Sequence, residues 1–428
     1  MAKRKIIITT NLYLTSKKPS SVFDHPLAVR NFSYELEKGY LKSVQKLKVP
    51  QNIDLILNFL IAGARKLNPD FKKKIVDYFK PHYRYRKIRL FFPEQISSLK
   101  KQLKDKEIIG TENYCAVRNT AFILAFLQKA DILIQIDSDE SLPPEYVTEA
   151  IRIAKNNKLS AFGGFYLEEG RPLSPLFDPL DLWPKFSSMT VDYTRVMASK
   201  KPIPTIYGKG GNMVFLKSYY SRICYPKFVP RGEDTALGLR SWLVYYNGNS
   251  LAKIKAGDKT FRFHLSSSPK LMITHHTEHR SIQSFLPYLE KNLIRFAIER
   301  NTFQHQKKFT KDKLYSQATY ISRMLLIEDY EAFVNHIYDE CQNSCSLSAP
   351  LKKNPVYLAM KGLKKKPSHY PRYKAEEIEA SRKKVLRFCR GLRQKNLWQE
   401  YKKYQLKYLN LIKTLSSQKP SLLSKIEL

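Results

Sequence analysis

The chain has 428 residues and a formal net charge of +37. Its length predicts two domains, and its hydrophobic content of 43% excludes a disordered chain. Five cysteines are too few for a disulfide framework in a chain of this size. The charge excess predicts a polyanionic partner, which could be nucleic acid, an acidic membrane surface or a phosphorylated substrate.

Short apolar runs alternate with amphipathic stretches in the first half of the chain, as in a layered α/β domain. We expect strands over about 5–10, 87–92, 131–136, 159–166 and 206–216. The apolar run over 54–61 fits either a strand or a helix. Helices are expected over 112–129 and 143–157, where apolar residues recur at helical spacing. These elements predict a central sheet flanked by helices.

The second half of the chain has a different pattern. Residues 168–204 form a long Pro-containing stretch, which we interpret as an insertion or acceptor loop, because such connections usually carry function. From about residue 281 strands largely stop, and helices are expected over 315–338 and, as one long helix, over 376–415. We therefore predict an α/β domain over residues 1–280 and a basic helical region over 281–428.

A tyrosine stripe marks the last predicted helix. Tyr401, Tyr404 and Tyr408 recur on one face, with lysines between them. We expect the stripe to pack on the α/β domain and the lysines to rest on an anionic membrane surface. The apolar start at Ile6 is too short for a signal peptide, and no run reaches the roughly 18 apolar residues of a membrane span. A cytoplasmic protein is expected, at most peripheral on the inner face of a membrane.

An acidic cluster follows the predicted strand over 131–136. Its sequence is Asp137-Ser138-Asp139-Glu140, at the carboxyl end of the strand, where open α/β sheets bind ligands. Because strand side chains alternate, Asp137 and Asp139 should point the same way and could share one Mn²⁺ or Mg²⁺. Such an ion keeps open positions for a diphosphate. The alternative interpretation is a solvated acidic turn.

Two further clusters carry candidate chemistry. Glu233 and Asp234 begin an apparent helix, where one of them could be the general base for an acceptor hydroxyl or where both could simply cap the helix. His275 and His276 belong to a histidine-rich segment. Neutral imidazole is a frequent metal ligand, although an exposed polar strand end would look the same.

Taken in order, these motifs resemble the family 2 glycosyltransferases, which have the GT-A fold, a Rossmann-like mixed sheet flanked by helices. The resemblance covers roughly residues 5 to 280. The segments that carry it are Ile6–Asn11, Ala116–Ala121, Asp137–Asp139, Gly208–Met213, Glu233–Leu237 with Arg240, and His275 or His276.

The resemblance implies transfer of a sugar from a nucleotide-diphosphate donor to an acceptor hydroxyl, with inversion at the anomeric carbon. Asp234 would be the base, with Glu233 beside it. Asp137 and Asp139 would hold Mn²⁺ or Mg²⁺ on the diphosphate, and His275 or His276 would be a further ligand. The donor and acceptor pocket would involve Thr9 and Asn11 under the nucleoside, Arg118 near the diphosphate, and Gly211 and Asn212 around the sugar or acceptor.

Two alternatives remain open at this point. A retaining GT-A transferase would share the metal site and lack the base. A basic nucleic-acid-binding or nucleotidyl-transfer protein would explain the charge, but two-metal sites need carboxylates from a second strand, and no nucleic-acid module is recognisable. Nucleic acid is therefore not the expected partner, and the acceptor could be a glycan, a lipid-linked group or a protein.

Overall fold

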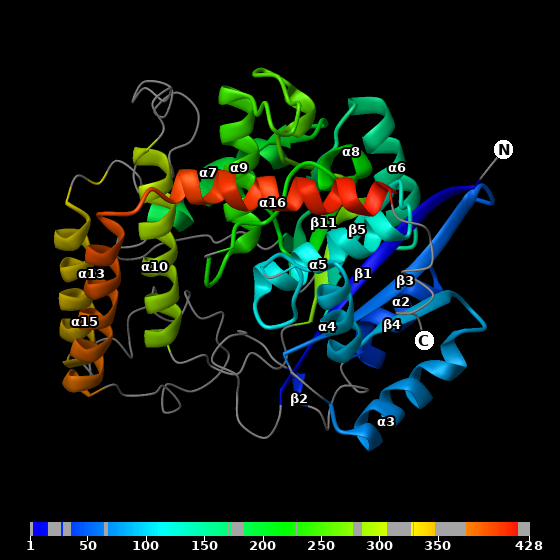
Figure 1. Cartoon of the computed structure of the whole chain (residues 1–428), viewed down its shortest axis with the longest axis horizontal. Helices are drawn as coiled ribbons and strands as arrows, with labels where there is room; N and C mark the ends of the chain where they lie inside the picture. The colour runs from blue at the N-terminus through cyan, green and yellow to red at the C-terminus, as the bar shows by residue number, and fades with distance from the viewer. Residues whose placement is uncertain are drawn as a thin grey trace. The chain divides into compact units, whose positions relative to one another are not determined.

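The computed structural model describes residues 3–15, 27–28, 36–63, 67–105, 107–168, 171–172, 184–227, 229–276, 285–305, 327, 329–346 and 374–417. The chain forms two compact units (Figure 1). The α/β unit comprises residues 1–173, 196–279 and 401–428, and the helical unit comprises 174–195 and 280–400. The end of the chain therefore belongs to the α/β unit, whereas the sequence pattern predicts one helical region over 281–428.

The α/β unit is built around a mixed sheet. Its strand order is β10 (Ile203–Pro204), β12 (His264–Leu265), β7 (Ala161–Gly163), β11 (Asn212–Leu216), β5 (Ile132–Asp137), β1 (Arg4–Thr15), β3 (Ile53–Ala62) and β4 (Lys87–Phe91), with β2 (Leu27–Ala28) beside β1. Strands β5, β1, β3 and β4 are parallel, and β11 is antiparallel to both of its neighbours. The ambiguous apolar run is therefore strand β3, and the predicted fold class is confirmed.

A small second sheet lies beside the carboxyl edge of β5. Its order is β6 (Glu140–Ser141), β13 (Ile273–His275), β8 (Tyr166–Glu168) and β9 (Arg171–Pro172). The single strand predicted over 159–166 is wrong, because the chain leaves β7 at Gly163 and enters the second sheet at Tyr166. Between them, a side chain at Gly164 would overlap the backbone carbonyl of Leu271, so only glycine permits this close approach.

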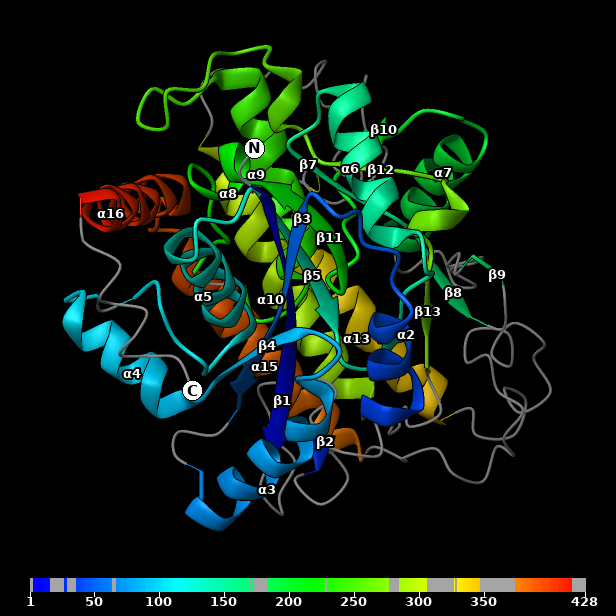
Figure 2. The same ribbon diagram turned by 90° about the vertical axis from the view of Figure 1, so that its right-hand side faces the viewer.

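The two faces of the central sheet carry different side chains. One face is apolar and packs against α2 (Leu41–Gln45), α3 (Pro69–Phe79) and α6 (Tyr146–Asn157). The other faces α5 (Tyr114–Leu127), and there the strand register aligns Asn58, Thr9 and Gln135 in one buried polar row. Figure 2 shows α2 and α6 on one side of β1 and α5 on the other.

The remaining helices fall into two groups. In the α/β unit they are η2 (Leu36–Tyr40), η3 (Lys80–His82), α4 (Pro93–Gln102), α8 (Lys217–Tyr220), α9 (Glu233–Asn247), η4 (Lys259–Phe261) and η5 (Pro269–Leu271). Most of α7 (Pro184–Met197) belongs to the helical unit, with α10 (Phe285–Gln304), α13 (Tyr330–Ser346) and α15 (Ala375–Leu392). Of the helix predicted over 315–338, residues 315–326 lie outside the described residues.

The long helix predicted over 376–415 is wrong, because the chain breaks into α15 and α16 (Leu397–Ser417). The Asn396 side chain accepts the N–H of Gln399 at 3.0 Å, as a helix N-cap does. Asn301 of α10 donates to the carbonyls of Leu392 and Lys395, each at 2.9 Å, and so satisfies the end of α15. These amide contacts come from a distant part of the chain and override the helical pattern.

The expected packing of the tyrosine stripe is confirmed. Tyr401, Tyr404 and Tyr408 are buried in the α/β unit. The Tyr404 hydroxyl accepts from the Asn119 amide of α5 at 3.0 Å, and the Tyr408 hydroxyl donates to the backbone carbonyl of Tyr220. Most of α16, from Tyr401 onward, is thus part of the α/β unit. Across the described ranges, no helix combines the length and apolar character needed to cross a membrane.

Candidate active site at the carboxyl edge of the sheet

Asp137 ends strand β5 on the face that packs against α5. There it meets Arg118, whose side chain is only 2% exposed. Arg118 Nη2 lies 3.1 Å from Asp137 Oδ1, and Arg118 Nε lies 3.2 Å from Oε1 of Glu233 on α9. Burial raises the pKa of Asp137, and the guanidinium charge opposes that rise. One buried arginine therefore joins carboxylates from two elements.

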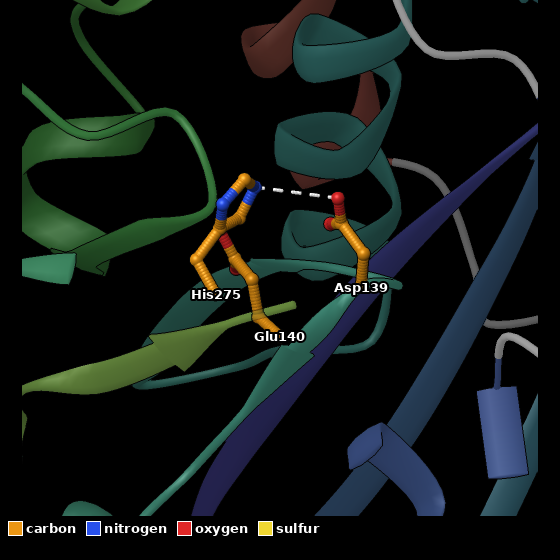
Figure 3. Close-up of side chains that lie close together, drawn as sticks. All are labelled: Asp139, Glu140 and His275. Atoms are coloured by element: carbon orange, nitrogen blue, oxygen red, sulfur yellow. Dashed lines mark ion pairs between the residues drawn. The ribbon is translucent and has the colours of Figure 1, made fainter. Parts of the chain in front are cut away.

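Asp139 lies in the turn after β5 and faces a different partner. Its Oδ2 is 3.3 Å from Nε2 of His275. Figure 3 shows the two side chains facing each other. The pairing of β6 with β13 sets His275 opposite Glu140. One ligand atom from each of Asp139, Glu140 and His275 lies within 4.8 Å of the others. This group of three side chains is the candidate metal site.

The predicted metal ligands thus separate into two sets. Asp139 and His275 come together, Asp137 pairs with Arg118, and Glu140 joins the group although the sequence interpretation did not select it. The strand alternation that aligned Asp137 with Asp139 does not extend beyond Asp137, because β5 ends there and a turn follows.

The His276 side chain contacts the segment that follows β5 and does not join the candidate ligands. Its Nε2 lies 2.6 Å from Ser141 Oγ, and its backbone N–H donates to the Asp139 carbonyl at 2.9 Å. The two neighbouring histidines therefore lie in different places: His275 ends β13 and contacts Asp139, whereas His276 follows the strand and contacts Ser141. His276 holds the acidic turn against the end of β13.

The donor set of the candidate site fits a divalent cation. Glu140 is fully buried, and its Oε2 accepts the Asp137 N–H at 2.8 Å. Among the described residues, Glu140 Oε1 and His275 Nδ1 have no hydrogen-bond partner. Burial, followed by the charges of Asp137 and Asp139, raises the pKa of Glu140. A cation held by two carboxylates and an imidazole would relieve this crowding of negative charge, and such ligands suit Mn²⁺.

A glycine-rich loop precedes β11 and touches both halves of the site. The Gly210 N–H donates to Asp234 Oδ2 at 3.1 Å. At Gly211 a side chain would overlap the carboxylate of Glu140. Between Tyr207 and these glycines lies Lys209, which is buried, and burial lowers the pKa of its ammonium to about 8. The loop needs glycine because its backbone passes directly beside acidic side chains.

Helix α9 begins with the predicted acidic pair. Gly232, which precedes it, has a φ of +67°, a conformation that favours glycine. Glu233 is buried against Arg118, and burial raises its pKa. Asp234 is half-buried and also accepts the Thr235 N–H at 2.7 Å.

The predicted donor-pocket residues lie around this edge. Asn11 is opposite Asp137 in the sheet register and Thr9 is opposite Gln135, and both side chains are fully buried. Asn212 is fixed by the Tyr146 hydroxyl, at 2.6 Å, and by the Leu271 carbonyl, at 2.8 Å. Asn212 therefore ties the sheet to the segment that leads into β13, and its contact with a sugar remains a prediction.

Three site residues were missed by the sequence interpretation: Glu140, Lys209 and Tyr166. Glu140 directly follows Asp139, and Lys209 lies inside the glycine motif, so their positions in those motifs were available signals. Tyr166 gave no signal, because its contact with His275 joins strands more than a hundred residues apart. Only the pairing of β8 with β13 brings them together.

Among known proteins, similarity to this chain is found in solved structures and not in family models or curated sequences. No family model matches the sequence, and no curated protein matches it. One similar solved structure is that of S. aureus TarS residues 1–349 in complex with UDP-GlcNAc. It is 13% identical to this chain, with a TM-score of 0.42, and the match covers 96% of this chain and 90% of that chain. The complex with UDP is similar at 12% identity with a TM-score of 0.43, covering 96% and 91%. At such TM-scores the likeness by itself defines neither the fold nor the function of this chain.

Proposed function

We propose that this chain is a divalent-metal-dependent glycosyltransferase that moves a sugar from a nucleotide-diphosphate donor to an acceptor hydroxyl. One observation carries the proposal. Consecutive glycines of a single loop touch Glu140 of the candidate metal group and Asp234 at the start of α9. A cation-binding group and a half-buried carboxylate therefore share one edge of the sheet, where open α/β sheets bind their ligands.

The metal in this proposal is Mn²⁺ or Mg²⁺, held by Asp139, Glu140 and His275. When bound, it would neutralise the negative charge of the donor diphosphate. Asp137 would contribute indirectly, because its carboxylate is held by Arg118. Arg118 Nη1 has no hydrogen-bond partner within the described ranges, so this nitrogen is the part of the guanidinium that could meet the donor.

Asp234 is the proposed general base. Its two oxygens accept the backbone N–H groups of Gly210 and Thr235, which fix the carboxylate while leaving each oxygen a further lone pair. The carboxylate would take the proton of the acceptor hydroxyl as that oxygen bonds to the anomeric carbon and the bond to the diphosphate breaks. Attack opposite the leaving group inverts the anomeric centre.

A donor screen tests the proposal. Thermal shift is measured with nucleotide sugars, UDP-GlcNAc among them, in Mn²⁺ and in EDTA, because a ligand of the folded state raises the melting temperature. We expect at least one nucleotide sugar to stabilise the protein in Mn²⁺ alone. No shift with any nucleotide sugar would contradict the proposal. With the donor known, retention of anomeric configuration in the product would replace the inverting mechanism with the retaining one.

We also propose that the exposed lysines of α16 attach the protein to an anionic membrane surface. Lys403 and Lys413 are exposed, while Lys407 is engaged by Glu107 at 3.0 Å. Each cation near an anionic bilayer contributes about 1 kcal/mol, so attachment through α16 alone would be weak and sensitive to salt.

Liposome co-sedimentation of the full chain tests this attachment. We expect binding to acidic liposomes at low salt, release at high salt, and weaker binding for Lys403→Gln/Lys413→Gln. The control, Lys73→Gln/Lys74→Gln, removes two exposed lysines from α3 instead. A full chain that stays in the supernatant at low salt would remove the membrane proposal.

A further inference from the structure

Tyr166 begins strand β8 and lies between the candidate metal group and the glycine loop. It is paired with Ile273 of β13, the strand that carries His275. Its hydroxyl and its ring make separate contacts with the site.

The ring of Tyr166 stacks on the imidazole of His275. The ring centroids are 5.2 Å apart and the planes differ by 8°, so the imidazole lies flat against the phenol. The ammonium of Lys209 also lies over the phenol, 5.4 Å from its centroid, in a cation–π contact. His275 Nδ1 has no hydrogen-bond partner among the described residues, so the imidazole is held by its stacking on Tyr166 and by Asp139 at Nε2.

The hydroxyl of Tyr166 is held at the Glu140 side of the site. It accepts the Gly211 N–H at 2.7 Å, and Gly211 is packed so closely on the Glu140 carboxylate that a side chain there would overlap it. The hydroxyl and the Glu140 carboxylate are therefore held against the same glycine. A neutral hydroxyl at this place stabilises the carboxylate without competing for the cation.

We propose that Tyr166 is a positioning residue that sets Glu140 and His275 for one divalent cation and ties them to the loop beside Asp234. The inference rests on the proposed metal site. The hydroxyl orients the carboxylate from β6, and the ring orients the imidazole from β13. Since Gly211 bonds Tyr166 and Gly210 bonds Asp234, the same side chain links the metal group to the proposed base. Side chains behind metal ligands typically change metal affinity by about 10- to 100-fold.

Two substitutions separate the two contacts. Tyr166→Phe removes the hydroxyl and keeps the ring, whereas Tyr166→Leu removes both. Tyr220→Phe is the control, because Tyr220 is a buried tyrosine whose hydroxyl donates to the Ala130 carbonyl away from the site. Mn²⁺ affinity is measured on the full chain by electron paramagnetic resonance, and the His275 ring resonance is measured by NMR in EDTA, assigned with His275→Gln. Thermal unfolding in EDTA confirms that each variant is folded.

We expect roughly 10-fold weaker Mn²⁺ binding for Tyr166→Phe, up to roughly 100-fold weaker for Tyr166→Leu, and unchanged binding for Tyr220→Phe. The His275 resonance should move downfield in Tyr166→Leu, as the stacked ring is lost, and stay in place in Tyr166→Phe. If both Tyr166 variants bind Mn²⁺ as the unsubstituted protein does, or the resonance stays in place in Tyr166→Leu, the positioning role is wrong while the metal site stands. If the unsubstituted protein does not bind Mn²⁺, the metal site is wrong and the positioning role with it.

Discussion

The two faces of the central sheet bury different chemistry. On the face against α2, α3 and α6, successive strands contribute Ile8, Leu57, Ile134 and Val214 to one apolar cluster. On the face against α5, the same strands bury Thr9, Asn58 and Gln135, and Arg118 and Asn119 approach from the helix. Polar groups cost free energy to bury unless they are bonded, so a polar face reduces stability relative to an apolar one. The comparison teaches that stability comes mainly from the apolar face, whereas the ion network of Arg118, Asp137 and Glu233 belongs to the other face.

The largest expected effect removes the proposed base at the edge of the polar face. Asp234→Asn keeps the shape of the side chain but cannot take a proton, so turnover should fall by roughly two to four orders of magnitude while donor binding survives. The control is Asp258→Asn, which alters another acidic helix cap, at η4, outside the site. Turnover is measured once the donor is identified, and a near-normal rate in Asp234→Asn would place the base elsewhere or indicate a retaining mechanism.

A second substitution tests the ion network of the polar face. Arg118→Met leaves the buried Glu233 and the partly exposed Asp137 without their shared cation, which should cost about 3–5 kcal/mol of unfolding free energy. Arg152→Met removes an arginine that is 56% exposed and paired with Glu149, and should cost less than about 1 kcal/mol. Urea unfolding of both variants measures the difference. Equal losses would mean that the buried network does not stabilise the fold.

A substitution on the apolar face should lower stability without changing the metal group. Phe79 of α3 is fully buried in the apolar cluster, and Phe79→Ala should cost about 3–5 kcal/mol through the cavity it leaves. Mn²⁺ affinity of the folded fraction should stay unchanged, because the Phe79 ring packs on Phe59 and Tyr78 and not on a candidate metal ligand. A large loss of Mn²⁺ affinity in folded Phe79→Ala would show that the two faces are not separate in function.

A histidine interrupts the apolar face, and it makes stability depend on pH. His264 is paired in register with Phe162 of the apolar cluster, and burial lowers its pKa from 6.5 to about 4. The unfolded chain therefore binds the proton first as pH falls, so this contribution is complete above about 6.5 and is lost toward 4. The lost stability amounts to about 3 kcal/mol.

Urea unfolding at pH 7 and pH 5 measures this dependence. The unsubstituted protein should lose more stability between the two values than His264→Gln does, because glutamine does not titrate. The same pH dependence in both proteins would mean that His264 is protonated in the folded state already at pH 5.

Much of the α/β fold follows from local sequence pattern. The apolar runs that became β1 and β5 end in polar residues, β4 alternates charged and apolar residues, and α5 has apolar residues at helical spacing. The predictions that failed depend on distant contacts. The break before Leu397 is fixed by Asn301, and the division at Gly164 by the approach of Leu271. Neither contact can be predicted from the local sequence pattern.

The candidate site was also predictable from the sequence only in part. Sequence pattern placed Asp137 and Asp139 at the carboxyl end of a strand and Glu233 and Asp234 at the start of a helix, because strand ends and helix starts can be located from residue order alone. Which carboxylate faces the histidine depends on the turn after β5 and on the pairing of β6 with β13. That geometry replaces Asp137 with Glu140 in the candidate metal group.

The central claim is that this edge binds a nucleoside diphosphate through a divalent cation. Calorimetry of the full chain with UDP in Mn²⁺ and in EDTA tests it most directly, with Glu140→Gln as the variant that weakens the metal group. We expect binding roughly tenfold or more tighter in Mn²⁺ than in EDTA, because the carboxylates alone repel the diphosphate, and a loss of that advantage in Glu140→Gln. Equal affinity for UDP in Mn²⁺ and in EDTA would contradict the account.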